Sequence, residues 1–273
     1  MGKTGGGKLL CDIPAHVRGM ADEHVKYAAQ MHLSFLVVRL LGISEKSKRE
    51  PSKRQSTDPN PLHIPDSPEE AELMLRLLTP LAKAQTALAT IYGLRFCMES
   101  LGGVGYLENH EDPLLNIARL FRDANVLSIW EGTTDVMADD VARVIKGPQG
   151  DKVLKVMREW VYSATKTGGK VRLNSERGNL LDRWTAWENM IQSSSREELK
   201  WKGRDIMEEL DKIVCGCLLV LDAESDGNDL SREKAKRWVD RPFKDDKVRN
   251  WEVHAAWDKK IVFGDAASEK ARL

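Results

Sequence analysis

The longest helix pattern in this 273-residue sequence sets the strongest constraint on its fold. Ser67-Pro-Glu-Glu70 is a strong helix start, because Ser can cap the first turn, Pro fits its first position and Glu follows three residues after the cap. Apolar residues then recur at helical spacing as far as Leu101. At about 1.5 Å per residue, this predicts a helix about 50 Å long, bent near Pro80.

A second long helix is predicted near the N-terminus. Asp12-Ile-Pro14 opens it, and Gly42 is expected to stop it after Leu41. Its candidate inward side chains are Val17, Met20, Tyr27, Met31 and Phe35. Residues 44–65 are rich in serines, prolines and charges, so they are predicted to form a mobile loop.

Two shorter helices complete the first 147 residues. Gly102-Gly-Val-Gly105 ends the long helix, Asp112-Pro113 starts the third, and the fourth carries Val136 to Ile145. We find no convincing period-two pattern of the kind that strands require. Two long and two shorter helices predict an all-α fold, with an antiparallel four-helix bundle over residues 1–147.

The composition shifts after residue 150, where seven of the eight tryptophans lie. Apolar stripes at helical spacing continue there, and such stripes are usually packing faces. They predict an additional helical domain over residues 151–263. The polar end, residues 264–273, is expected to be a flexible tail.

Composition excludes several kinds of site and partner. Forty-two basic and 42 acidic residues give no net charge, so no global field favours nucleic acid or a membrane surface. The four cysteines form no Cys-x-x-Cys pair, which indicates a reducing compartment and no zinc or other metal site. No membrane span is expected, because the apolar run from Leu33 to Leu41 is broken by Arg39.

One carboxylate stands out just before the fourth helix, in Ser128-Ile-Trp-Glu-Gly-Thr-Thr-Asp135. One interpretation is structural, since Thr133 or Thr134 can cap the helix and acidic residues favour its positive end. The other is chemical, because Glu131 lies between a bulky ring and a flexible Gly-Thr-Thr turn.

The stretch from Met98 to Gly147 resembles the C-terminal helical domain of acyl-CoA dehydrogenases. Three blocks of that family occur here in order, namely Leu-Gly-Gly-x-Gly-Tyr at 101–106, Arg-Asp-Ala at 122–124 and aromatic-Glu-Gly-Thr at 130–133. Within the family the sequence most resembles the AidB branch, and residues 151–263 are similar to the additional helical domain of that branch. Glu99 departs from the family pattern, in which a Gln contacts the flavin of a neighbouring subunit.

The resemblance implies an FAD-dependent dehydrogenation of an acyl-CoA thioester. Glu131 matches the family's catalytic base, which removes a proton from the carbon next to the thioester while hydride passes to the flavin. Ile129, Trp130 and bound substrate would desolvate this carboxylate. The resemblance also implies a set of flavin-binding residues, namely Trp130, Gly132, Thr133, Asp135, Gly102, Gly103 and Arg122.

The same resemblance implies that the chain is the C-terminal part of an enzyme, without the N-terminal helical domain and the β-domain that holds the flavin ring. The Arg-x-x-Phe pattern with which the family grips a partner's flavin would fall on Lys3 and Gly6, so its ring is lost. We therefore expect the chain by itself to bind FAD poorly. The family also implies a homo-oligomer.

Two alternatives to the enzyme stay open. The AidB branch binds duplex DNA, but residues 151–273 hold 25 Lys and Arg against 23 Asp and Glu, a weak basis for phosphate contacts. The other alternative is a non-catalytic helical subunit that only oligomerises.

The C-terminal Ala271-Arg272-Leu273 has the small-basic-Leu form of a peroxisomal address. This address predicts a peroxisomal protein, with mitochondrion or cytosol as the alternative.

Overall fold

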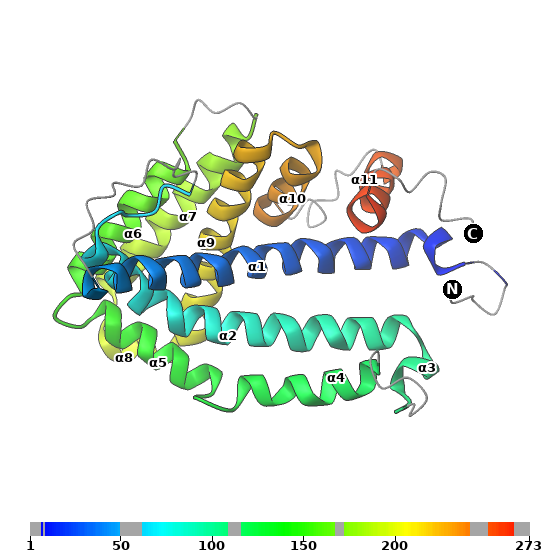
Figure 1. Cartoon of the computed structure of the whole chain (residues 1–273), viewed down its shortest axis with the longest axis horizontal. Helices are drawn as coiled ribbons and strands as arrows, with labels where there is room; N and C mark the ends of the chain where they lie inside the picture. Colours follow the sequence, from blue (N-terminus) through cyan, green and yellow to red (C-terminus); the bar gives the residue numbers. More distant parts are fainter. Residues whose placement is uncertain are drawn as a thin grey trace. The chain divides into compact units, whose positions relative to one another are not determined.

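The computed structural model of the chain describes residues 7, 9–49, 62–108, 116–166, 172–240 and 251–264 (Figure 1). These residues form helices and turns and contain no β-strand, which confirms the predicted all-α fold class. The α-helices are α1 (Pro14–Arg49), α2 (Pro68–Ser100), α3 (Gly103–Tyr106), α4 (Ile117–Ala124), α5 (Thr134–Ile145), α6 (Gly150–Ala164), α7 (Asn174–Ser193), α8 (Arg196–Trp201), α9 (Gly203–Asp226), α10 (Asp229–Asp240) and α11 (Trp251–Phe263). Two 3-10 helices, η1 (Leu10–Asp12) and η2 (Asn125–Ser128), precede α1 and follow α4.

The chain divides into two compact units. Unit 1 comprises Met1–Ala28, Ala87–Leu127 and Arg241–Leu273, and unit 2 comprises Ala29–Thr86 and Ser128–Asp240. The helices α1 and α2 each contribute to both units. These units are groups of residues in contact and do not test the domain boundary near residue 150. That boundary stays a prediction.

In unit 1, the first half of α1 lies close to the second half of α2. A Cβ atom added to Gly19 would lie 2.5 Å from the Phe96 ring, so the absence of a side chain lets the two helices approach. The helix α2 ends at Ser100, just before Gly102, whose φ of 65° is left-handed and favours glycine. The glycine-rich end that the sequence predicts for this helix is confirmed.

The buried helix α9 organises unit 2. It packs against α5, α6, α7, α8 and α10. The run from Ile213 to Leu221 is entirely buried, and it includes Cys215 and Cys217 as small apolar residues. A Cβ added to Gly216 would lie 2.5 Å from Leu180 of α7, and one added to Gly203 would lie 2.7 Å from Ala138 of α5. The helices α5 to α10 therefore pack tightly around α9, as the apolar stripes within residues 151–240 predict.

The predicted end of α1 at Leu41 is wrong. The helix continues through Gly42 to Arg49, so residues 44–49 of the predicted loop are helical. A glycine inside a helix costs only about 1 kcal/mol relative to alanine, and Gly42 keeps a helical conformation. At the other end of the predicted loop, Ile64 is buried and the Leu62 carbonyl accepts a hydrogen bond of 3.0 Å from Trp160 Nε1. Residues 50–61 lie outside the described residues.

The start that the sequence predicts for the third helix, at Asp112-Pro113, also lies outside the described residues. In the described part, α4 begins at Ile117. The Asn116 side chain caps it by accepting a hydrogen bond from the Arg119 backbone N–H at 2.9 Å. The tail beyond residue 264 is likewise outside the described residues.

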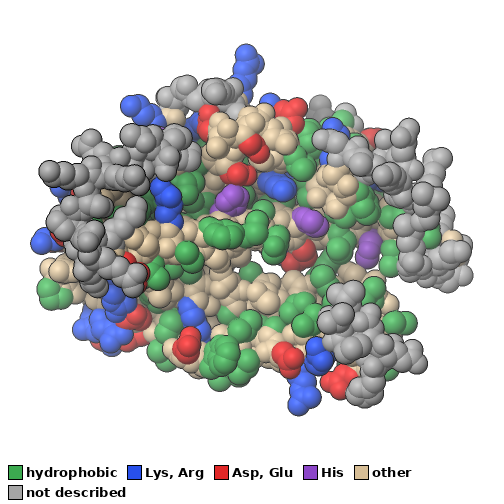
Figure 2. All heavy atoms as spheres, viewed as in Figure 1, with side chains coloured by type: hydrophobic (Ala, Val, Ile, Leu, Met, Phe, Trp, Pro, Cys, Tyr) green, Lys and Arg blue, Asp and Glu red, His purple; other side chains and the backbone are tan. Residues whose placement is uncertain are grey.

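The face of α1 that packs inward differs from the predicted one. Tyr27 is 65% exposed, Phe35 is 66% exposed and Met31 is also exposed, whereas Val17 is buried as expected. The buried side chains of this helix lie at other positions, namely Ala21, Val25, Ala28, Ala29, Leu33, Leu36 and Leu40. Because α1 is apolar on more than one side, helical spacing fits two stripes equally well. Figure 2 shows hydrophobic side chains at the molecular surface along this helix.

By length and composition, α1 also meets the usual criterion for a membrane-spanning helix over Pro14–Glu45. Its most apolar 18-residue window has a mean hydropathy of 1.2, and 28% of that window is buried. The prediction that no stretch is apolar enough was therefore wrong on composition, because two charges in such a window are tolerated. Core helices of soluble proteins meet the same criterion.

Candidate functional site

The segment 129–133 is a short connector between η2 and α5, and we call it the Glu131 connector. Glu131 lies in a turn just before α5, as the sequence predicts. Thr133 is the N-cap of α5, and its hydroxyl accepts a hydrogen bond of 3.5 Å from the Val136 backbone N–H. The capping interpretation of this motif is therefore confirmed, while the chemical one needs further argument.

Two consecutive residues of the connector have a positive φ. Glu131 has a φ of 58° and Gly132 a φ of 125°. The left-handed conformation costs a non-glycine residue about 1–2 kcal/mol, so it persists only where neighbouring contacts hold it. A Cβ added to Gly132 would lie 2.6 Å from Met137 Cε and 3.2 Å from Val136 Cγ1. Both its backbone angle and its neighbours therefore favour glycine at position 132.

The connector presents apolar and acidic side chains to solvent. Ile129 is 62% exposed, Trp130 is 55% exposed and Glu131 is also exposed. The desolvation of the Glu131 carboxylate that the sequence predicts is therefore not provided by these two neighbours in the described structure. An apolar ligand lying over Trp130 would have to supply it.

Asp135, in the first turn of α5, is held by Arg204, a residue that the sequence analysis did not single out. Arg204 of α9 donates from Nε to Asp135 Oδ1 at 2.7 Å and from Nη2 to Oδ2 at 3.1 Å. This bidentate hydrogen bond lowers the pKa of the Asp135 carboxyl. The carboxylate of Asp135 is thus neutralised by a guanidinium 69 positions away in the sequence.

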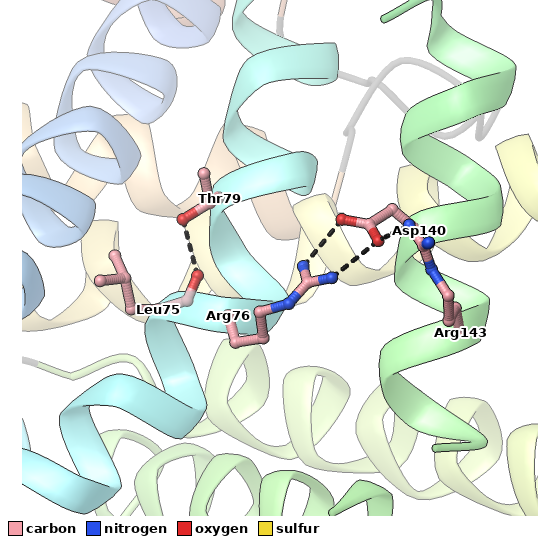
Figure 3. Close-up of polar contacts among 5 residues, drawn as sticks. All are labelled: Leu75, Arg76, Thr79, Asp140 and Arg143. Atoms are coloured by element: carbon pink, nitrogen blue, oxygen red, sulfur yellow. Dashed lines mark hydrogen bonds and ion pairs between the residues drawn. The ribbon is translucent and has the colours of Figure 1, made fainter.

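Two basic residues of α2 reach α5 and the connector. Arg76 donates to both carboxylate oxygens of Asp140, each at 2.7 Å, and Arg143 also donates to Asp140 (Figure 3). These bonds hold the pKa of the Asp140 carboxyl below its ordinary value, and the bonds from Arg76 contribute most. Further along α2, Lys83 Nζ donates to the Gly132 carbonyl. Sequence reasoning missed both residues, because nothing local links them to partners 49 or more positions away.

The remaining predicted flavin-binding residues lie in unit 1. Gly102 precedes α3 and Gly103 is its first residue, and a Cβ added to either would meet nothing within 4 Å. The guanidinium of Arg122, on α4, is exposed and lies 3.9 Å from the carboxylate of Glu108. The structure thus assigns Gly102, Gly103 and Arg122 to unit 1, whereas the residues from Trp130 to Asp135 belong to unit 2.

Metal ligands do not cluster in the part of the chain that the structure describes. No group of three or more His, Cys, Asp or Glu residues there is arranged to hold a metal ion.

Residues 66–146 match the family model described as acyl-CoA dehydrogenase, C-terminal domain. Residues 66–146 are thus similar to the C-terminal domain of acyl-CoA dehydrogenases. The matched stretch includes the connector, all three sequence blocks and both basic residues of α2, and it confirms the resemblance that the blocks predict.

Two curated relatives are similar to the chain, one over nearly its whole length and the other over a shorter stretch at higher identity. Acyl-CoA dehydrogenase family member 11 of Caenorhabditis elegans is 29% identical over 288 residues, which cover 95% of this chain and 40% of that protein. The putative acyl-CoA dehydrogenase AidB of Escherichia coli strain K12 is 41% identical over 78 residues, which cover 29% of this chain and 14% of that protein. The chain thus spans at most about two fifths of the length of these relatives.

Solved structures show the same fold outside the matched domain as well. The crystal structure of C. elegans ACDH-11 in complex with C11-CoA aligns with a TM-score of 0.67 at 26% identity, over 93% of this chain and 41% of that one. The apo-form of Bd2924 aligns with a TM-score of 0.59 at 25% identity, over 80% of this chain and 36% of that one. Both alignments therefore extend beyond the matched residues 66–146.

Proposed function

We propose that this chain is the C-terminal part of an FAD-dependent oxidoreductase that removes two hydrogens from an acyl-CoA thioester, with Glu131 as the base. The observation that carries the proposal is the exposed carboxylate of Glu131, held in a left-handed turn at the mouth of α5 inside the matched domain. The similar structure of ACDH-11 was solved in complex with C11-CoA, which supports an acyl-CoA as the substrate class.

The chemistry asked of Glu131 is proton removal from the carbon next to the thioester carbonyl. A carboxylate can take this proton when its position is fixed and water is excluded, and Trp130 offers an apolar surface beside it. The backbone N–H of Glu131 would donate to the thioester oxygen and stabilise the charge that develops there. FAD, when bound, accepts the hydride that leaves the neighbouring carbon.

Within each unit, the residues expected to bind the cofactor suit an anionic group. In unit 1, Arg122 offers an exposed guanidinium that lies 3.9 Å from the Glu108 carboxylate, and a Cβ added to Gly102 or Gly103 would meet nothing within 4 Å. Thr133 is exposed at the N-terminus of α5, which favours negative charge. Asp135 would oppose an anion, but its pairing with Arg204 removes much of that repulsion.

The test needs a flavin site and separates binding from chemistry. We would build a chimera in which this chain replaces the matching portion of the C. elegans relative. The chimera is loaded with FAD and mixed with an eleven-carbon acyl-CoA under anaerobic conditions. We expect loss of flavin absorbance in the parent chimera and in a Glu72→Gln control, which alters an exposed glutamate of α2.

In Glu131→Gln we expect FAD to remain bound while its reduction by acyl-CoA falls by at least about a thousandfold, because the base is lost. Reduction at the parent rate in that variant would assign proton removal to another group. The chain alone is expected to retain FAD poorly, as measured by absorbance after gel filtration.

A further inference from the structure

The Glu131 connector carries two left-handed residues, and the side-chain hydrogen bonds at the start of α5 do not reach them. The Thr133 cap bonds to Val136 and the Arg204 guanidinium bonds to Asp135, so both act on the first turn of the helix. Neither contact reaches the peptide between Glu131 and Gly132 or the carbonyl that follows it. A hydrogen bond to that carbonyl from outside α5 adds a restraint on the direction of Glu131.

Lys83 provides that restraint. It donates to the Gly132 carbonyl from α2, and a hydrogen bond from an ammonium is stronger than one from a neutral donor. The side chain is half-buried, so its apolar stem has limited freedom and the ammonium is delivered to one place.

The helix α2 carries a second basic residue on the same face. Arg76 lies seven residues before Lys83, which is two helical turns, and it bonds to Asp140 within α5. The two segments are therefore antiparallel here: the earlier residue of α2, Arg76, contacts the later residue, Asp140, and the later one, Lys83, contacts Gly132. One residue fastens the body of α5, and the other fastens the turn that precedes it.

We propose that Lys83 is a positioning residue of the candidate site, which fixes the direction of Glu131 by holding the Gly132 carbonyl. The inference rests on the proposed function only where it treats the Glu131 connector as part of an active site. The contact itself is a property of the fold, so it can be tested whether or not the protein dehydrogenates a thioester.

The experiment measures backbone order in the full chain by ¹⁵N relaxation. The variants are Lys83→Met, which keeps the stem and removes the donor, Lys83→Arg, which restores a cationic donor, and Arg76→Met, the matched control on the same face of α2. In Lys83→Met, we expect the amide order parameters of Glu131 and Gly132 to fall from about 0.85 to below about 0.6. Unchanged resonances of buried α9 residues would show that the variant is folded.

Lys83→Arg should restore the order parameters, and Arg76→Met should leave them high. Unchanged order in Lys83→Met, or an equal loss in Arg76→Met, would overturn the proposal. In the chimera, Lys83→Met should lower kcat on the order of ten- to a hundred-fold with KM within about twofold. If the parent chimera shows no turnover, the proposed function fails, while the order parameters still decide the role of Lys83.

Discussion

Stability should fall as pH rises because of one buried carboxylate, Asp211 of α9. Its side chain accepts hydrogen bonds from Gln30 Nε2 at 3.0 Å on each oxygen and from Cys215 Sγ at 3.3 Å. The ammonium of Lys212 is instead bonded to Glu208 at 2.9 Å. Burial raises the pKa of the Asp211 carboxyl from its ordinary 3.8 to about 6, although the hydrogen bonds from Gln30 and Cys215 lower it in part.

The sign and size follow from proton linkage. Between pH 3.8 and about 6 the folded protein holds a proton on Asp211 that the unfolded chain releases, so raising the pH favours unfolding. The stabilisation is complete below pH 3.8 and is lost once the pH passes about 6. A pKa difference of this size corresponds to about 3 kcal/mol.

Asp211→Asn removes this titration, since an amide is neutral throughout. The new amide can also donate to Gln30 Oε1, a buried acceptor with no hydrogen-bond partner in the described structure. We expect the variant's advantage over the parent to grow by about 2 kcal/mol from pH 4 to pH 7. In urea this shifts the midpoint by about 1 M or more.

Tryptophan fluorescence reports the transition, because Trp187 of α7 is buried and donates to the Ile206 carbonyl of α9 at 3.1 Å. The matched control is Asp140→Asn, since bonds to Arg76 and Arg143 lower the pKa of that carboxyl. This control should be less stable than the parent above pH 3.8, with a deficit that shrinks only as the pH falls below 3.8. A difference between Asp211→Asn and the parent that stays constant from pH 4 to pH 7 would refute the reasoning.

Two further predictions concern assembly and location. The exposed apolar side chains Tyr27, Phe35 and Val38 of α1 lead us to expect a homo-oligomer at micromolar concentration, and sedimentation as a monomer would contradict it. We also propose that Ala271-Arg272-Leu273, outside the described residues, directs the chain to peroxisomes. A fluorescent protein fused to the N-terminus should give punctate signal that Leu273→Asp disperses, and a diffuse parent signal would reject the address.

Local rules predicted the starts of helices well. The start at Ser67 is confirmed, because α2 begins at Pro68 and the Ser67 hydroxyl accepts a hydrogen bond of 3.4 Å from the Glu70 N–H. The cap at Thr133 is confirmed in the same way. Such features depend on residues within one turn of each other, so the sequence contains all the information they need.

Features that depend on distant partners could not be predicted in this way. The buried face of α1 is decided by what α1 packs against, so its apolar spacing allowed the wrong stripe, with Tyr27 and Phe35 inward. Lys83 and Arg204 contact residues of the α5 region that lie 49 and 69 positions away in the sequence. A single sequence offers no signal for such pairs, because a lysine or arginine on a helix is usually solvated.

Capping and chemistry, the two explanations of the Glu131 motif, make different demands on the backbone. A cap needs only an extended Thr133, which its φ of −68° and ψ of 168° supply. It does not need a left-handed glutamate just before a left-handed glycine, nor a lysine from another helix on the glycine carbonyl. Replacing Glu131 with glycine would relieve about 1–2 kcal/mol of strain and leave the cap intact. The helix start alone does not explain why a strained position carries a glutamate. The proposed base does, because its carboxylate has to be fixed and accessible to the substrate.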